Sequence, residues 1–153
     1  MAKLPTMIRP ARPDELPALS ELALRSKAVW GYSAEFMAAC RSELTVRAEH
    51  LPLAFVAELE GTIAGFYALS VLDAARVELE FLFVEPGSLR RGCGRALLLH
   101  AREQARRLGC SAIAIQGDPH AAGFYAAVGA RPIGSRESDS IPGRMLPLYE
   151  LPC

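Results

Sequence analysis

The sequence predicts an α/β (α+β) domain in which a mixed central sheet of about seven strands is flanked by four helices. Strand-like and helix-like apolar patterns follow each other in the order strand, helix, helix, three strands, helix, strand, helix and two strands. Hydrophobic residues make up 51% of the 153 residues, which is enough for one ordinary core. Because no Gly/Ser/Pro-rich linker or repeat divides the chain, we expect residues 1–153 to form a single domain.

The first third of the chain is expected to hold one strand and two helices. Residues 6–9 suit a short strand, and Pro13 followed by two acidic residues suits the first turn of a helix. This helix would bury an apolar stripe formed by Leu16, Leu19, Leu22 and Ala23. Residues 30–33 interrupt it, and Ser33 is a suitable N-cap for a second helix. The apolar side of the second helix would carry Phe36, Met37, Cys40 and Leu44.

The remainder of the chain alternates between strand and helix patterns. Strands are expected at residues 53–59, 62–72, 76–84, 111–115, 131–135 and 145–151. Residues 94–108 have the 3.6-residue apolar period of a helix, which Gly109 would end. A last helix would begin after Asp118, an N-cap followed by proline, and would end at Gly129.

Charge and cysteine usage exclude several classes of protein. Lys plus Arg number 17 and Asp plus Glu also number 17, so the chain lacks the basic excess typical of a nucleic-acid binder. The four cysteines and three histidines form neither C-x-x-C nor H-E-x-x-H, so we expect reduced thiols, a cytoplasmic location and no metal site. No apolar run has the length of a signal peptide or a membrane span, which predicts no membrane partner.

The most informative segment is a strand that runs through a polar loop into a helix, at residues 77–98. The loop combines two arginines with two glycines, namely Arg90, Arg91, Gly92 and Gly94. Glycines let the backbone approach a ligand, and the N–H groups at a helix start suit phosphate oxygens. The segment is neither a Walker A loop nor a dinucleotide G-x-G-x-x-G motif, because Leu97 occupies the third glycine position. The plain alternative is a structural turn with solvated arginines.

Three further side chains are candidates for acid–base chemistry. Tyr125 lies two helical turns after Asp118, so both point along nearly the same side of a helix. A tyrosine hydroxyl can protonate a departing thiolate, although Tyr125 can equally be a core aromatic. Glu78 and Glu80 alternate along one strand and should share a face with Leu82 and Val84. There a carboxylate could accept a proton from an amine, directly or through water, unless this face is simply solvated.

Two segments together carry a family resemblance. The run VEPGSLRRGCGR at residues 84–95 resembles the acetyl-CoA motif of the GNAT superfamily of N-acetyltransferases. The run DPHAAGFYAAVG at residues 118–129 resembles the second motif of that superfamily, and the order of elements matches along essentially the whole chain. The resemblance implies acetyl-CoA as cofactor and direct attack of a neutral amine on the thioester, without an acyl-enzyme.

The resemblance also implies roles for individual residues. Main-chain groups of the 82–84 strand end would pair with the pantetheine arm, and N–H groups of the loop would hold the pyrophosphate. Tyr125 would be the general acid, with Glu78 as the first choice of general base and Glu80 as the second. The implied cofactor-binding residues are Leu82, Phe83, Val84, Arg90, Arg91, Gly92, Cys93, Gly94, Arg95, Asp118 and Tyr125. Leu89 and Asp118 depart from the usual Gln or Arg and Asn of the family, and the expected task of Asp118 is to cap its helix.

The acceptor is expected to contact the two regions in which the superfamily varies. Trp30 and Tyr32 would form an aromatic wall, and Arg144 in the 138–144 hairpin would hold an acceptor carboxylate. These features favour a small primary amine such as an amino acid, whereas a core tryptophan and a solvated arginine are the simpler alternatives. A protein N-terminal or lysine acetyltransferase and a non-catalytic acyl-CoA-binding regulatory module are the competing functions. Superfamily members often dimerise through edge strands, which leaves a homodimer open.

Overall fold

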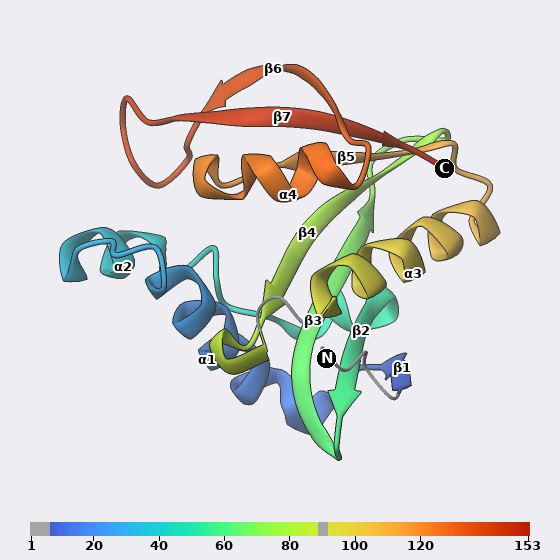
Figure 1. Ribbon diagram of the computed structural model, residues 1–153, viewed down its shortest axis with the longest axis horizontal. Coiled ribbons are helices and arrows are strands. Elements are labelled where there is room, and N and C mark those ends of the chain that lie inside the picture. Colours follow the sequence, from blue (N-terminus) through green and yellow to red (C-terminus); the bar gives the residue numbers. More distant parts are fainter. Residues whose placement is uncertain (1–6, 89–91) are drawn as a thin grey trace.

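A computed structural model of the protein describes residues 7–88 and 92–153. Its centre is a seven-stranded mixed sheet with the strand order β1-β2-β3-β4-β5-β7-β6 (Figure 1). The strands are β1 (Met7–Pro10), β2 (Ala54–Leu59), β3 (Thr62–Val71), β4 (Arg76–Val84), β5 (Ala112–Gln116), β6 (Arg131–Glu137) and β7 (Met145–Pro152). Within the described ranges β4 and β5 form the parallel pair, and the other neighbours are antiparallel. The α/β architecture and the mixed sheet expected from the sequence are confirmed.

Four α-helices connect and cover the strands. They are α1 (Leu16–Ala28), α2 (Ala34–Cys40), α3 (Cys93–Arg107) and α4 (Ala122–Ala127). The last helix is shorter than the sequence predicts, because residues Pro119–Ala121 form a 3₁₀ turn before it. Of the helices in residues 7–88 and 92–153, none is both long and apolar enough to span a membrane.

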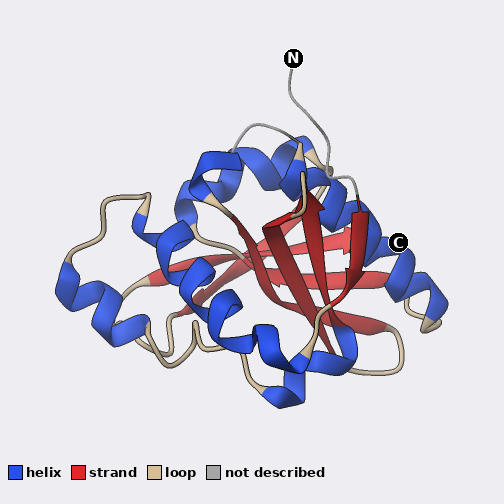
Figure 2. Ribbon diagram, turned by 90° about the horizontal axis from the view of Figure 1, so that it is seen from below, coloured by secondary structure: helices blue, strands red, loops and turns tan. Residues whose placement is uncertain are grey.

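The helices cover both faces of the sheet, and one layer of hydrophobic core lies on each side of it (Figure 2). Residues from α1 and α2, such as Leu19 and Cys40, pack with Phe66 and Phe81 on one face. On the other face, α3 and α4 pack over a core that includes Leu97 and Tyr125. We call these the α1/α2 face and the α3/α4 face. Burial of both faces explains why β3 is apolar along most of its length.

A β-bulge interrupts β4 at Glu80. Ala68 of β3 pairs with Phe81 and the next residue, Leu69, pairs with Leu79, so Glu80 is an extra residue without a partner. A bulge reverses the alternation of side chains along the strand. Leu79 and Leu82 therefore both belong to the α3/α4 face, although three positions separate them.

The sheet splits between β4 and β5. Pairing of these two strands runs from Arg76 to Leu79 and stops there, while β4 continues to Val84. Beyond this point, β5, β6 and β7 diverge from the β1–β4 group (Figure 1). The far end of β4 consequently pairs with β3 on one side only, within the described part of the chain.

Candidate active site

A cavity of about 550 Å³ occupies the split, and we call it the donor cleft. One wall is the end of β4, and another consists of the 3₁₀ turn before α4 and the first residues of α4, up to Tyr125. The lining residues central to the argument are Leu82, Phe83, Val84, Gly92, Phe124 and Tyr125. Because one edge of β4 is unpaired here, backbone N–H and C=O groups are free to bind an extended ligand.

The start of α3 points its first N–H groups at the same cleft. Gly92 takes a left-handed conformation, φ 75°, directly before the helix, a geometry that glycine adopts without strain. Gly92, Cys93, Gly94 and Arg95 all line the cleft. A side chain at Gly94 would meet the Phe124 ring at 3.3 Å, so this position admits little more than glycine. The helix start thus fits an anionic group such as a pyrophosphate, and Leu89, Arg90 and Arg91 of the same motif lie outside the described residues.

Cys93 is buried at the first position of α3 and is 2% exposed. Burial raises the pKa of its thiol to about 11. A thiol is a poor nucleophile until it ionises. The environment therefore suits packing rather than covalent catalysis.

Tyr125 reaches the donor cleft from α4 with 7% of its surface exposed. Its ring contacts that of Tyr149, with 5.1 Å between centroids, and lies against Gly117, where a Cβ atom would stand 3.0 Å from the ring. Burial raises the pKa of the Tyr125 hydroxyl, and the nearby Tyr149 and Asp118 raise it further. The hydroxyl therefore stays protonated at neutral pH and can act as a proton donor.

A second cavity of about 330 Å³ lies on the other side of β4, and we call it the acceptor cavity. Six residues line both cavities: Lys27, Leu79, Glu80, Phe83, Gln116 and Asp118. The two spaces therefore adjoin at the β4 bulge and the end of β5. A group bound in one can contact a group bound in the other at this junction.

The structure separates the two glutamates that the sequence placed together. Glu80 lies in the bulge and lines both cavities, whereas Glu78 lines the acceptor cavity alone. The expectation that both share a face with Leu82 and Val84 is wrong, because the bulge shifts the register. The Glu80 carboxylate accepts a hydrogen bond of 2.6 Å from the Ser70 hydroxyl. Burial, followed by repulsion from Glu80, raises the pKa of Glu78.

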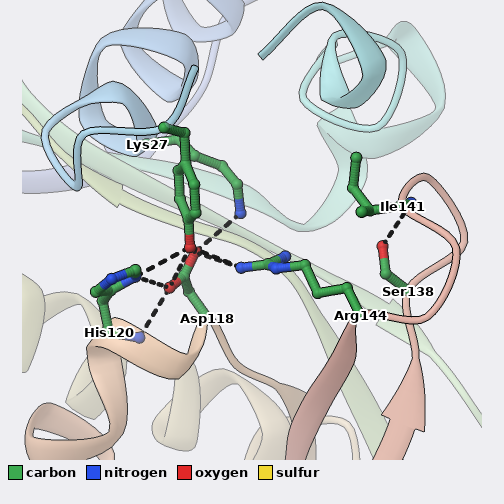
Figure 3. A network of polar contacts seen from close by, with 7 residues as sticks. Lys27, Asp118, His120, Ser138, Ile141 and Arg144 are labelled. Atoms are coloured by element: carbon green, nitrogen blue, oxygen red, sulfur yellow. Dashed lines mark hydrogen bonds and ion pairs between the residues drawn. The ribbon is translucent and has the colours of Figure 1, made fainter. Parts of the chain in front are cut away.

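Asp118 is the centre of a polar network at the rim of both cavities (Figure 3). Its carboxylate accepts the backbone N–H of His120 at 2.9 Å, which confirms the expected capping role. The same carboxylate binds Lys27 Nζ at 3.0 Å and Arg144 Nη2 at 3.4 Å. The Tyr32 hydroxyl donates to it at 2.8 Å. Although burial opposes ionisation, the His120 N–H and the Lys27 charge lower the pKa of Asp118 to about 2.

Arg144 is held inside this network instead of being free for a ligand. It donates to the Tyr32 hydroxyl at 2.6 Å and lies over the Phe36 ring, 4.8 Å from its centroid. The Ser138 hydroxyl accepts the N–H groups of Ser140 and Ile141 and so shapes the turn that presents Arg144. The expected bidentate contact between Arg144 and an acceptor carboxylate would require these bonds to break.

The two aromatic residues expected to form one wall are placed differently. Trp30 stacks on the His120 ring, with 5.2 Å between centroids, and lines the donor cleft. Tyr32 stacks on Phe36 at 4.0 Å and is not among the lining residues of either cavity. Its hydroxyl is bound to Asp118 and Arg144, and burial, then Asp118, raises the pKa of Tyr32 to about 12.

Sequence reasoning missed Lys27 and His120. Lys27 lies in the last turn of α1, where a lysine normally faces solvent, and its partner Asp118 is 91 residues away. His120 follows the capping residue, which was the one available signal. Within the part of the chain that the structure describes, no group of three or more His, Cys, Asp or Glu is arranged to hold a metal ion.

The split sheet, the helix start and the two adjoining cavities define an acyltransferase-type site, and sequence comparison agrees. The model of the acetyltransferase (GNAT) family matches residues 16–130. The chain therefore belongs to the GNAT family of acetyltransferases. Among proteins with curated descriptions, none matches this chain.

Solved structures with the same fold come from several organisms. A GCN5-related N-acetyltransferase from Rhodopseudomonas palustris is 22% identical with a TM-score of 0.76, and the match covers 98% of this chain and 95% of that one. The PaiA N-acetyltransferase of Thermoplasma acidophilum, in complex with coenzyme A, is 20% identical with a TM-score of 0.74, covering 96% and 98%. The ribosomal-protein-S18-alanine N-acetyltransferase of Escherichia coli is 24% identical with a TM-score of 0.71, covering 95% and 92%. At these identities the likeness establishes the fold alone.

Proposed function

We propose that this protein transfers the acetyl group of acetyl-CoA to a primary amine of a small molecule. The observation that carries the proposal is the junction of the two cavities at Glu80, with Tyr125 on the donor side. One cavity fits a long extended donor, and the other fits a compact acceptor. An amine and a thioester would meet where a carboxylate and a protonated phenol are both close by.

The donor would be held mainly by backbone groups. The unpaired edge of β4 at Leu82 and Val84 would bind the pantetheine amides, and the start of α3 at Gly92 and Gly94 would face the pyrophosphate. Arg90 and Arg91 would add charge on the basis of the motif alone. Acetyl-CoA supplies an activated acetyl thioester when bound.

The transfer needs one base and one acid. Glu80 is our choice of base, in preference to Glu78, because it borders both cavities. It would take a proton from the amine, directly or through water, while the amine nitrogen attacks the thioester carbonyl carbon. The C–N bond forms, the C–S bond breaks, and the Tyr125 hydroxyl donates its proton to the departing thiolate. The raised pKa of Tyr125 keeps its hydroxyl protonated before the reaction, and the phenolate then regains a proton from solvent while Glu80 releases the proton of the amine.

A small acceptor is supported by the dimensions of the acceptor cavity. Its volume of about 330 Å³ suits a small molecule better than a folded protein surface. The Asp118 network joins α1, the segment before α2, the β5–α4 connection and the β6–β7 turn beside this cavity.

Two measurements test the proposal. Titration calorimetry with acetyl-CoA and with coenzyme A should give saturable binding, and a thiol-release assay with a panel of primary amines should show turnover. Replacing both Arg90 and Arg91 by glutamate should weaken binding by about tenfold or more, since charge reversal acts on the pyrophosphate. The matched control reverses Arg106 and Arg107, exposed at the far end of α3, and should leave binding unchanged.

Each outcome has a defined meaning. Absence of binding at about 1 mM donor would contradict the donor assignment. Binding without thiol release for any amine would instead favour a non-catalytic acyl-CoA-binding module.

A further inference from the structure

We infer that the acceptor amine carries a second positive charge, which the acceptor cavity binds with Glu43 and Glu78 while the reacting nitrogen lies at Glu80. This inference rests on the proposed function and specifies the chemical class of its substrate. It replaces the carboxylate-bearing amine expected from the sequence.

The side chains that line the acceptor cavity carry more negative than positive charge. Five carboxylates face three cationic side chains there, so the wall is acidic although the whole chain is neutral. The carboxylates are Glu43, Glu78, Glu80, Asp118 and Asp139, and the cations are Lys27, Arg136 and Arg144. A concave wall with surplus negative charge attracts and concentrates cations.

The cationic side chains of the acceptor cavity already form ion pairs with carboxylates of the protein. Lys27 and Arg144 both point to Asp118 (Figure 3), at 3.0 and 3.4 Å. Arg136 lies 3.5 Å from Asp139. A ligand carboxylate would compete with these carboxylates for the same cations, and it would also enter a field of surplus negative charge.

Glu43, Glu78 and Glu80, in contrast, form no ion pair with a residue in the described ranges. Other carboxylates of the chain, including Glu85 and Asp73, do form such pairs. Burial and then repulsion from Glu80 raise the pKa of the half-buried Glu78, and the positive charge of Arg136 partly offsets them. A bound cation would relieve that repulsion. The binding of the cation would also be strong, because opposite charges attract more strongly in a partly desolvated cavity.

The positions of the three glutamates set the arrangement of the substrate. Glu80 alone among them also lines the donor cleft, so the nitrogen that is acetylated lies beside it. Glu43 and Glu78 line the acceptor cavity alone, further from the thioester. The cavity also has apolar lining residues, among them Leu79, Phe81 and Phe83, which suit a short methylene chain. The class of substrate is therefore a small aliphatic diamine or a related dication.

The test compares three amines of equal chain length that differ in one terminal group. They are 1,5-diaminopentane, pentylamine and 5-aminopentanoate, whose ends are an ammonium, a methyl and a carboxylate. Each is titrated into the protein saturated with coenzyme A, and each is assayed for kcat/KM by thiol release. We expect the diamine to bind about tenfold more tightly than pentylamine, with 5-aminopentanoate the weakest, as one charge-assisted contact implies.

Variants identify the group that holds the second charge. E43Q and E78Q, singly and together, should lower the affinity for the diamine by a larger factor than the affinity for pentylamine, which carries a single charge. Glu49→Gln is the matched control, because Glu49 is exposed in the turn before β2 and lines neither cavity. The advantage of the diamine should also shrink as the salt concentration rises.

The outcomes separate this inference from the proposed function. Turnover of all three amines with similar kcat/KM, or a preference for 5-aminopentanoate, would overturn the dication and leave the acetyltransferase standing. Binding of coenzyme A without binding or turnover of any amine would overturn both.

Discussion

The donor cleft and the acceptor cavity adjoin, yet the protein builds them in different ways. The donor cleft consists of backbone and apolar packing: the unpaired edge of β4, the glycines at the start of α3 and the buried ring of Tyr125. The acceptor cavity is walled by charged side chains from widely separated segments, such as Lys27, Glu43 and Arg144. The first kind of site depends on the fold, and the second depends on which side chains the fold brings together.

This difference has a consequence for how each region tolerates change. Backbone groups cannot be substituted, so the donor cleft can bind one ligand across a wide range of sequences. Side-chain walls change with single substitutions, so acceptor preference can change while the donor site persists. Variants in the two regions should accordingly affect different kinetic constants.

The largest effect is expected from Tyr125→Phe. Loss of the hydroxyl removes the acid while the ring still packs against Tyr149 and Gly117. We expect kcat to fall by about 10² to 10⁴, with little change in the affinity for coenzyme A. Steady-state thiol release and calorimetry measure the two quantities, and Tyr67→Phe is the matched control because Tyr67 is a buried tyrosine that lines neither cavity. An unchanged kcat would reject Tyr125 as the acid.

The next effect concerns Asp118 and stability. Asp118→Ala leaves Lys27 and Arg144, with side chains only 11% and 16% exposed, without their shared counter-charge. We expect the free energy of unfolding to fall by about 2 kcal/mol, and the KM for the amine to rise, because breaking a partly buried pair strands both cations. Asp139→Ala is the control. Its pair with Arg136 is exposed, and its loss should cost less than about 0.5 kcal/mol in urea unfolding.

The pKa of Asp118 adds a pH signature to this comparison. Because its pKa is lowered to about 2 in the folded protein, against about 3.9 in an unfolded chain, ionised Asp118 stabilises the fold at pH values above about 4. That contribution falls progressively as the pH drops from about 5 to about 1, because half of Asp118 is still ionised in the folded protein at pH 2. The stability difference between the wild type and Asp118→Asn should therefore shrink over this interval, as urea unfolding at stepped pH will measure. A difference at pH 2 as large as the one at neutral pH would contradict the linkage.

Much of the donor side could be predicted from the sequence, and less of the acceptor side. Gly92, Gly94 and Tyr125 stand in contiguous motifs whose local geometry follows from chain direction and helix period. Asp118 was predicted as a cap because its partner is two residues away, at His120. Its other partners, Lys27 and Arg144, lie 91 and 26 residues away, and no local pattern indicates such a meeting.

The bulge at Glu80 shows the same limit within one strand. Alternation along β4 predicts that Glu78, Glu80 and Leu82 share a face, but the register is decided by pairing with β3. Local sequence carries no signal for the extra residue. The two glutamates are distinguished by the cavities that they line, because Glu80 borders both cavities and Glu78 borders one.

Substitution of each glutamate in turn distinguishes the role of Glu80 from that of Glu78. Glu80→Gln should lower kcat for every amine by about 10- to 100-fold and should flatten the rise of kcat with pH, because the base is removed. Glu78→Gln should change the KM for a dicationic amine and leave kcat for pentylamine nearly unchanged. The pH profiles of kcat for both variants provide the measurement. If Glu78→Gln gave the larger loss of kcat, the order of the two roles would be reversed.

The smallest effect is expected from Gly117→Ala, at a glycine that lines the acceptor cavity and packs against the Tyr125 ring. The added Cβ atom would stand 3.0 Å from both the Tyr125 and Tyr149 rings, so one ring must move by a few tenths of an ångström. We expect a loss of about 1–2 kcal/mol in stability and a severalfold fall in kcat, since Tyr125 is displaced from its position in the cleft. Gly87→Ala, at which an added Cβ meets nothing within 4 Å, is the control and should leave both quantities unchanged. If Gly117→Ala lowers kcat while the affinity for coenzyme A persists, proton donation depends on side-chain placement even in the region that the backbone builds.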